Sequence, residues 1–309
     1  MRLLSFSVLL IGLLAACGSE PSDSAPPVDE VATPVAPAAD VAPSDSATYE
    51  AFEDVMAYAR EHDLAERPIG EVAQEIGVQL LGRPYLAGML DEAEQEALVV
   101  DLMGFDCVTY VENVVALAQA VKAGDPSYAT YVQNLESLRY RGGTLDGYCS
   151  RLHYFSDWML DNERRGNVEI VSRDFGEPFD KTIDFMSGHR DAYPKLVGND
   201  SLYACIQQVE AGLADHGIFY VPQDQIRSVY DRLRAGDIIA TATNIDGLDV
   251  THTGFVYKHD DGRTGFLHAS LSGEVKISDD LADYVNGVKA QTGIIVARPL
   301  APGTAGSPG

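Results

Sequence analysis

Apolar side chains recur every three or four positions through most of the first half of the chain. This period places them on one face of a helix. We therefore predict helices over residues 49–63, 69–82, 127–138 and 151–164, and a further helix that begins at Cys107. Before that helix, Pro84 and Gly88 interrupt the pattern, and residues 97–105 are expected to form a strand or an extended segment.

The last third of the chain has a different pattern, in which short segments rich in strand-forming residues alternate with turns such as Ser272-Gly273. The predicted strands are 236–243, 251–258, 264–270, 274–278 and 293–299. Helices first and an antiparallel sheet later predict an α+β fold. The signals in residues 167–222 are mixed, and we interpret this stretch as a central insertion.

The first residues of the chain have the pattern of a secretory signal. Arg2 precedes an apolar run that is shorter than the roughly 20 residues needed to span a bilayer. The ending "LLAAC" resembles a bacterial lipobox, so we predict that residues 1–16 are removed and that Cys17 becomes a lipid anchor to a membrane. Gly18 favours the outer membrane, with the protein facing the periplasm. The alternative is a plain secretory signal that happens to end near a cysteine.

Two segments lack the composition of a folded core. Residues 18–48 contain six prolines and no aromatic residue, Lys or Arg, so we interpret residues 17–48 as the lipidated cysteine and a disordered tether. Residues 300–309 are expected to be a disordered tail. The folded domain is then predicted to span residues 49–299, which is long enough for one sizeable core.

Charge and cysteine content narrow the choice of function. The net charge of −25 argues against nucleic acid as a partner, because phosphate binding needs a basic surface. Besides Cys17 the chain has Cys107, Cys149 and Cys205, an odd number that leaves at least one thiol free in an oxidising compartment. Either all three are reduced or one pair forms a disulfide. We favour Cys107 as the free thiol, with a Cys149–Cys205 disulfide as a possibility.

Cys107 is placed where a thiol can be activated. If Asp106 is the N-cap, the cysteine lies in the first turn of its helix, where the helix dipole and free N–H groups are expected to lower the thiol pKa. The plainer alternative is a small buried cysteine on an apolar helix. A thiol nucleophile also needs a base, and His252 and His268 lie on successive predicted strands. On antiparallel neighbours, one imidazole can act as base while the other orients it.

The blocks "LGRPYLAG", "GFDC", "RAGD", "THTGFVY" and "FLHAS", in this order, resemble the NlpC-type papain-like cysteine hydrolases of the bacterial cell wall. The resemblance covers roughly residues 80–300 and implies a papain-like core, with the cysteine helix packed on an antiparallel sheet. It further implies that Cys107 is the nucleophile, His252 the base and His268 the orienting residue. Tyr85 and Asp106 then border the nucleophile and contribute to substrate binding.

Within this superfamily the sequence departs from the commoner endopeptidases, because Val108 and Thr109 stand where Ser-Gly usually follows the cysteine. "DCVTYVENVVALA" and "YRGGTLDGYCSRLHYFSDWMLDN" instead resemble the N-acetylmuramoyl-L-alanine amidase-like branch. This resemblance implies hydrolysis of the amide between muramic acid and L-Ala in peptidoglycan or muropeptides, with no cofactor and no metal. A stem-peptide endopeptidase and a non-catalytic peptidoglycan-binding lipoprotein remain as alternatives.

The segment "YCSRLHYFSDW" offers a second group of candidate residues. Arg151 is suited to bind a peptide carboxylate in a bidentate manner, and Tyr148 and His153 are expected to line the substrate groove. In the alternative interpretation, the apolar residues at helical spacing in 151–164 face the core, and Arg151 and Asp157 are ordinary surface residues.

Overall fold

The computed structural model describes residues 45–214 and 217–303. The predicted signal peptide, Cys17, the tether up to residue 44 and the tail from residue 304 lie outside the described residues. The helices of the described part are α1 Ser46–Glu61, α2 Ile69–Gln79, α3 Cys107–Lys122, α4 Tyr128–Arg139, α5 Phe155–Arg164, α6 Phe185–Gly188, α7 Asp200–Gly212 and α8 Leu281–Asn286. Short 3₁₀ turns are η1 Leu64–Glu66, η2 Arg141–Gly143, η3 Tyr148–Ser150, η4 Val171–Asp174, η5 Arg190–Ala192 and η6 Ile226–Val229.

The strands of the described part form one antiparallel sheet. They are β1 Val168–Ile170, β2 Glu177–Pro178, β3 Phe219–Pro222, β4 Ile238–Thr243, β5 Val250–Lys258, β6 Thr264–Ala269, β7 Val275–Ser278 and β8 Gln291–Pro299. The order is β2-β3-β8-β4-β5-β6-β7, and β1 pairs with β8 off this path. Helices and an antiparallel sheet thus form a mixed fold, as the sequence predicts. The five predicted strands of the last third correspond to β4 to β8.

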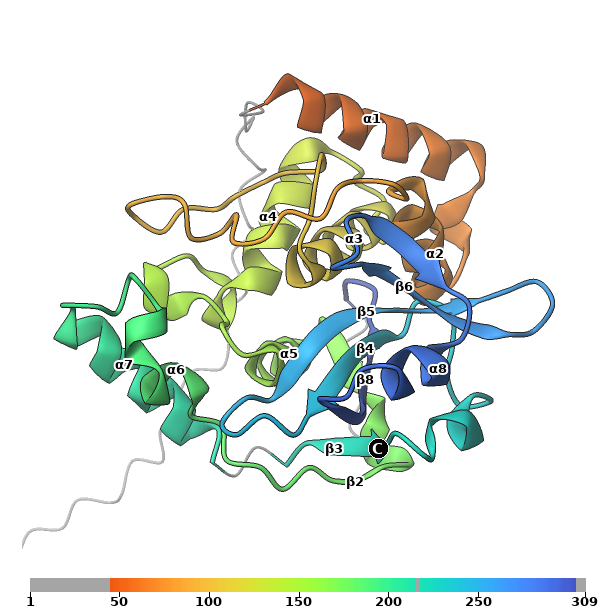
Figure 1. Ribbon diagram of the computed structural model, residues 1–309. Helices are drawn as coiled ribbons and strands as arrows, with labels where there is room; N and C mark the ends of the chain where they lie inside the picture. The colour runs from red at the N-terminus through yellow and green to blue at the C-terminus, as the bar shows by residue number, and fades with distance from the viewer. Residues whose placement is uncertain (1–44, 215–216, 304–309) are drawn as a thin grey trace, which may run out of the picture. The chain divides into compact units, whose positions relative to one another are not determined.

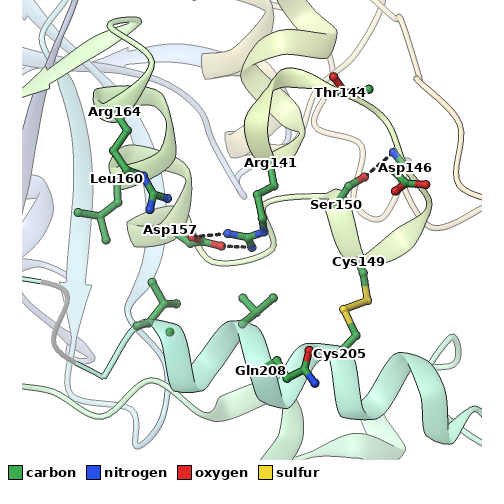
Figure 2. A pocket seen from close by; sticks show the side chains of 13 residues that line it. Arg141, Thr144, Asp146, Cys149, Ser150, Asp157, Leu160, Arg164, Cys205 and Gln208 are labelled. Atoms are coloured by element: carbon green, nitrogen blue, oxygen red, sulfur yellow. Dashed lines mark hydrogen bonds and ion pairs between the residues drawn. A yellow bond between two sulfur atoms is a disulfide. The ribbon is translucent and has the colours of Figure 1, made fainter. Parts of the chain in front are cut away.

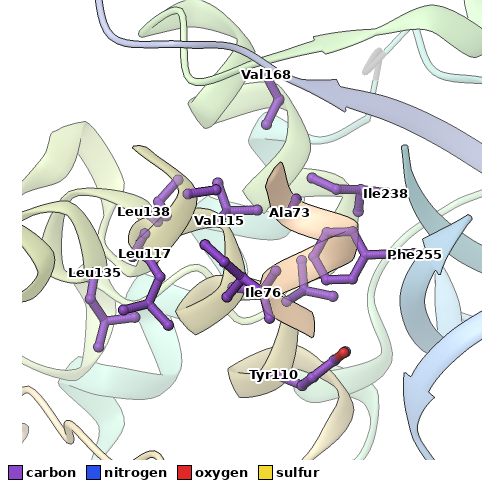
Figure 3. Packing of buried hydrophobic residues seen from close by; sticks show 14 of the residues in the cluster. Ala73, Ile76, Tyr110, Val115, Leu117, Leu135, Leu138, Val168, Ile238 and Phe255 are labelled. Carbon is purple, nitrogen blue, oxygen red and sulfur yellow. The ribbon is translucent and has the colours of Figure 1, made fainter. Parts of the chain in front are cut away.

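Helix α3 packs on one face of this sheet. Its apolar residues join those of α2 and of β4, β5 and β6 in the main core, which includes Ile76, Val115, Ile238 and Phe255 (Figure 3). Successive strand residues point to opposite faces, and Ile239 and Val256 accordingly belong to a second cluster, with α8 and η6. In Figure 1, α1 to α4 gather beside the sheet, whereas α6 and α7 lie together at one side.

Two predicted helix starts are wrong, and the helix predicted over residues 69–82 ends at Gln79. Helix α1 begins at Ser46 rather than Tyr49, because the Asp45 side chain accepts hydrogen bonds from the backbone N–H groups at the start of the helix. Helix α5 begins at Phe155 rather than Arg151, because Arg151 is extended and forms an isolated antiparallel bridge with Tyr140. Residues 97–105 contain no regular strand and form the extended alternative that the sequence left open.

The interpretation of residues 167–222 as an insertion is only partly right. β1 and β3 from this stretch both pair with β8, so they extend the main sheet. The segment between them contributes α6 and α7, and α7 is joined to η3 by a disulfide between Cys149 and Cys205. Figure 2 shows this disulfide at the rim of a groove that also contains the ion pair of Arg141 with Asp157. Within the described residues, no helix combines the length and hydrophobicity that a membrane span requires.

Candidate active site

Cys107 is the first residue of α3, and the turn before it is fixed by a reciprocal cap. The Asp106 Oδ1 atom accepts the backbone N–H of Thr109 at 2.7 Å, and the Thr109 hydroxyl accepts the backbone N–H of Asp106 at 3.0 Å. The carbonyl of Cys107 accepts a hydrogen bond of 2.8 Å from the Thr253 hydroxyl on β5. This bond attaches the start of α3 to the strand residue that follows His252. Cys107 is a free, half-buried thiol.

The two predicted histidines are in direct contact. His252 on β5 and His268 on β6 share a hydrogen bond of 2.7 Å between Nε2 of the first and Nδ1 of the second. The other nitrogen of His268, Nε2, lies 3.1 Å from the Ser278 hydroxyl on β7. The other nitrogen of His252, Nδ1, is buried and has no hydrogen-bond partner among the described residues. Within this part of the chain, the pair therefore has one buried nitrogen that makes no hydrogen bond.

Burial shifts the pKa values of the cysteine and both histidines in the direction that favours the neutral form of each side chain. Burial, with a smaller contribution from the Asp106 carboxylate, raises the pKa of the Cys107 thiol to about 11. Burial lowers the pKa of His252 to about 4. For His268, burial and the charges of His252 and Lys276 lower the pKa to about 3. The lowered thiol pKa expected from the helix N-terminus is therefore wrong, because desolvation of the thiolate outweighs the helix dipole.

Two tyrosines are close enough to the thiol to interact with it electrostatically. Burial, with a further contribution from Cys107, raises the pKa of both Tyr85 and Tyr284 to about 12. Tyr85 is held by backbone bonding to Gly273 at 2.8 Å and by a bridge to Phe105. The Tyr284 ring on α8 lies 4.7 Å from the His268 ring and 5.8 Å from the His252 ring, measured between centroids. Tyr284 is thus a neighbour shared by the thiol and the imidazoles.

Four of the five predicted substrate-binding residues line one cavity of about 230 Å³. These are Asp106, Tyr148, Arg151 and His153. Asp106 and Val108, the residues on either side of Cys107 in the sequence, line the cavity, whereas Cys107 itself is not among its lining residues. Tyr85 instead lines a neighbouring groove, together with Met89 and other residues of the loop 86–101. Gly88, Leu90 and Asp91 of the same loop line the cavity. The loop therefore contributes to both hollows.

Arg151 is not the surface residue that the alternative interpretation described. It is buried, forms ion pairs with Asp91 at 2.5 Å and with Glu96 at 3.3 Å, and lies 5.0 Å from the centre of the Tyr148 ring. Asp157 is also buried, in its ion pair with Arg141.

His153 accompanies this cluster. Its Nε2 atom lies 2.9 Å from the carbonyl oxygen of Tyr148. Burial and the charge of Arg151 lower its pKa to about 3, so it is neutral at pH 7. The cavity wall beyond it includes the buried ion pair of Glu112 with Arg139, 2.7 Å long. Glu112 thus has a structural role, as the buried partner of Arg139.

The residues missed by sequence reasoning are those that support the predicted ones from distant segments. Thr253 directly follows His252 in the sequence and could have been proposed from that position, whereas Ser278 and Tyr284 belong to segments with no distinctive motif. Asp91 lies in a polar loop whose position over Arg151 depends on the tertiary fold. Across residues 45–214 and 217–303, no group of three or more His, Cys, Asp or Glu residues is arranged to hold a metal ion.

Comparisons with known proteins show which family and which folds the chain resembles. A family model described as AmiA-like, N-acetylmuramoyl-L-alanine amidase-like, matches residues 75–294. A solved structure of an N-acetylmuramoyl-L-alanine amidase from Bacteroides uniformis ATCC 8492 is 31% identical to the chain, with a TM-score of 0.70 over 75% of this chain and 99% of that one. No curated protein matches the chain.

Two further structures are similar. A Bacteroides fragilis protein with a provisional xylanase assignment is 33% identical, with a TM-score of 0.64 over 72% of this chain and 98% of that one. A Legionella pneumophila protein is 19% identical, with a TM-score of 0.60 over 83% of this chain and 97% of that one, which shows a similar fold and no more.

Proposed function

Because this chain belongs to the N-acetylmuramoyl-L-alanine amidase-like family, we propose that it hydrolyses the amide between N-acetylmuramic acid and L-Ala in peptidoglycan or its soluble muropeptides. The observation that carries the proposal is the unpartnered, buried Nδ1 atom of His252, on the strand that is bonded to the Cys107 turn. A buried nitrogen without a partner costs stability, and a role as proton acceptor explains why it is retained.

The reaction begins with a neutral thiol and a neutral imidazole, in keeping with their shifted pKa values. In one tautomer, the Nε2–H group of His268 donates a hydrogen bond to the Ser278 hydroxyl, and Nδ1 of His268 accepts a hydrogen bond from the Nε2–H group of His252. The lone pair of His252 Nδ1 is then free. His252 then takes the thiol proton as the sulfur of Cys107 attacks the carbonyl carbon of the lactyl amide.

Collapse of the tetrahedral intermediate breaks the carbon–nitrogen bond. His252 donates its proton to the departing amine of L-Ala, and the lactyl group remains on Cys107 as a thioester. Water then attacks the thioester carbonyl, His252 takes a proton from the water, and the proton returns to the sulfur as the free carboxylic acid leaves. His268 holds the His252 ring throughout and shares the positive charge that develops on it.

The oxyanion of the intermediate has two donors at this position. The backbone N–H of Cys107 belongs to the first turn of α3, where N–H groups have no acceptor within the helix. The Tyr85 hydroxyl is the second donor, and its raised pKa of about 12 keeps it protonated well above neutral pH. A thiol at the start of a helix, with that start hydrogen-bonded to the histidine-bearing strand of an antiparallel sheet, supports assignment of a papain-like core of the NlpC type.

The neighbouring structure assigned as a xylanase does not change this proposal. Glycosidases work with two carboxyl groups on either side of the scissile bond. The carboxylates at this end of α3 are already engaged, Asp106 as the helix N-cap and Glu112 in its ion pair with Arg139. The thiol, the two imidazoles and the two phenols suit acyl transfer.

The test is to incubate the protein with purified muropeptides, including anhydro forms, and to weigh the products by mass spectrometry. Release of an intact stem peptide is expected from the wild type and not from Cys107→Ala or His252→Ala. The exposed His189 provides a matched control, because His189→Ala removes an imidazole remote from α3 and leaves activity unchanged. Cleavage inside the stem would indicate an endopeptidase, and normal hydrolysis by Cys107→Ala would refute the mechanism.

We further propose that this hydrolase is attached to a bacterial membrane through Cys17 and acts on the periplasmic side. The lipobox-like ending of residues 1–16 supports the attachment. The disulfide between Cys149 and Cys205 supports an oxidising compartment, because such bonds are rare in reducing cytosol.

A further inference from the structure

Arg151 is held between two carboxylates that differ in their surroundings. The Glu96 side chain is 3% exposed and also accepts a hydrogen bond of 3.1 Å from the Tyr140 hydroxyl. The Asp91 side chain is 59% exposed and lies 2.5 Å from the guanidinium of Arg151. Glu96 is therefore the permanent counter-ion. Asp91 can leave the arginine and be solvated, because its own carboxylate is largely exposed and Glu96 still pairs with Arg151.

The loop that carries Asp91 is anchored on its C-terminal side. Arg139 donates to the carbonyl of Val99 at 2.6 Å, and Tyr140 contacts Glu96 as well as the carbonyl of Ala97. Lys195, from the segment between η5 and α7, donates to the carbonyl of Glu94 at 2.9 Å and also to that of Ala93. These anchors hold the loop from residue 93 onward, so Asp91 can move without displacing the rest.

The charges around the cavity restrict what can bind to Arg151. The two arginines, Arg139 and Arg151, face four carboxylates, those of Asp91, Glu96, Asp106 and Glu112. A further carboxylate added to this set would be repelled. An acidic ligand gains from Arg151 only if it takes the place of a carboxylate already there, and Asp91 is the exposed member of the pair bound to Arg151.

We propose that Asp91 is an internal substitute for a substrate carboxylate. In the free protein it occupies Arg151, and the substrate displaces it. Arg151, with Glu96 behind it and the Tyr148 ring stacked against it, then forms a subsite for the carboxylate of an acidic residue close to the scissile amide. The proposal rests on the proposed function for the class of ligand, a peptidoglycan stem peptide, whose second residue supplies such a carboxylate.

The experiment measures binding without turnover. The Cys107→Ala protein is titrated calorimetrically with L-Ala-D-Glu whose γ-carboxyl is blocked as an amide, which leaves a free α-carboxylate, and with the same dipeptide amidated at both carboxyls. The acidic peptide is expected to bind about tenfold more tightly than the amide. Adding Asp91→Asn tightens binding of the acidic peptide about fivefold, because the peptide no longer competes with the Asp91 carboxylate for Arg151. Binding of the amide is unchanged.

Glu94→Gln is the matched control, since it removes one negative charge from an exposed residue of the same loop. It is expected to change neither affinity, which separates displacement of Asp91 from a general reduction in repulsion. Arg151→Gln should abolish the preference for acid over amide, and Arg151→Lys should restore part of it; circular dichroism checks that both fold.

Equal binding of the two peptides, no binding of either, or weaker binding of the acidic peptide by Asp91→Asn would overturn the subsite. Failure of the wild type to hydrolyse muropeptides would instead refute the amidase reaction. The binding preference is measured on a protein that cannot turn over, so the two failures are distinguishable.

Discussion

At the scale of single residues, the pKa of a cysteine depends more on its solvation than on its position in a helix. Asp106 caps α3 as the sequence indicates, and Cys107 occupies the first turn. The sequence does not reveal how much water is removed from the thiol. Desolvation raises the pKa of Cys107 to about 11, and the adjacent Asp106 carboxylate opposes ionisation further. A neutral thiol that loses its proton only as it attacks is the consequence.

Asp106 therefore caps α3 and also raises the pKa of the thiol, and a single substitution separates these two effects. Asparagine is an equally good N-cap, so Asp106→Asn keeps the helix start while removing the negative charge beside Cys107. We expect the thiol pKa to fall and the rate of alkylation by iodoacetamide at pH 8 to rise severalfold. In the wild type, the rate should keep rising with pH above 8, because the thiolate fraction grows toward a pKa of about 11.

Asp101→Asn serves as the control, since it removes a nearby carboxylate that does not raise the pKa of Cys107. A wild-type alkylation rate that is already maximal at pH 5 would indicate a preformed thiolate–imidazolium pair. Slower alkylation of Asp106→Asn would show that the carboxylate assists ionisation. Either result contradicts the neutral pair.

At the scale of elements, periodicity predicted the helices and strands that surround the site but not the segment that forms its cavity. The β4 to β8 strands follow from short segments of strand-forming residues between turns, and α3 from an apolar run after a polar cap, because both signals are local in the sequence. The helix predicted over residues 151–164 starts too early, because the backbone at Arg151 is extended and bridges to Tyr140. Tertiary ion pairs with Asp91 and Glu96, contributed by a loop far along the chain, stabilise this conformation and leave no local signal.

The disulfide joins this extended segment to α7, so it should stabilise the cavity wall. Cys149 and Cys205 are 56 residues apart in sequence, and closing a loop of that length is expected to contribute about 4 kcal/mol to the free energy of unfolding. The double variant Cys149→Ser/Cys205→Ser should lose roughly that amount in urea unfolding. It should also raise KM, because Tyr148, which lies against Arg151, is the residue before Cys149.

Cys107→Ser is the control for loss of a sulfur atom, and we expect its unfolding midpoint to match that of the wild type. Unchanged unfolding of the double variant, or unfolding of the wild type that is insensitive to a reductant, would show that this crosslink does not stabilise the fold. A raised KM with unchanged stability would confine its role to the cavity.

At the scale of the whole molecule, the charge of the chain and its proposed substrate have the same sign. With a net charge of −25, the protein has no general electrostatic attraction for an acidic peptide. Recognition must then come from a local cation in a low-dielectric cavity, where Arg151 interacts more strongly than an exposed arginine would. Attachment beside the wall is a second way to favour encounter, because it raises the local concentration of substrate.

Substitution of Cys17 tests directly whether attachment beside the wall favours encounter with the substrate. If Cys17 is acylated, Cys17→Ser should shift the protein from the membrane fraction to the soluble periplasmic fraction and abolish labelling by a fatty acid analogue. Cys107→Ser should remain in the membrane fraction, because its thiol belongs to the proposed catalytic site. A wild-type protein found in the soluble fraction would favour a plain secretory signal. If the anchor serves access rather than chemistry, wild type and Cys17→Ser should hydrolyse soluble muropeptides equally. The variant should then digest intact wall more slowly.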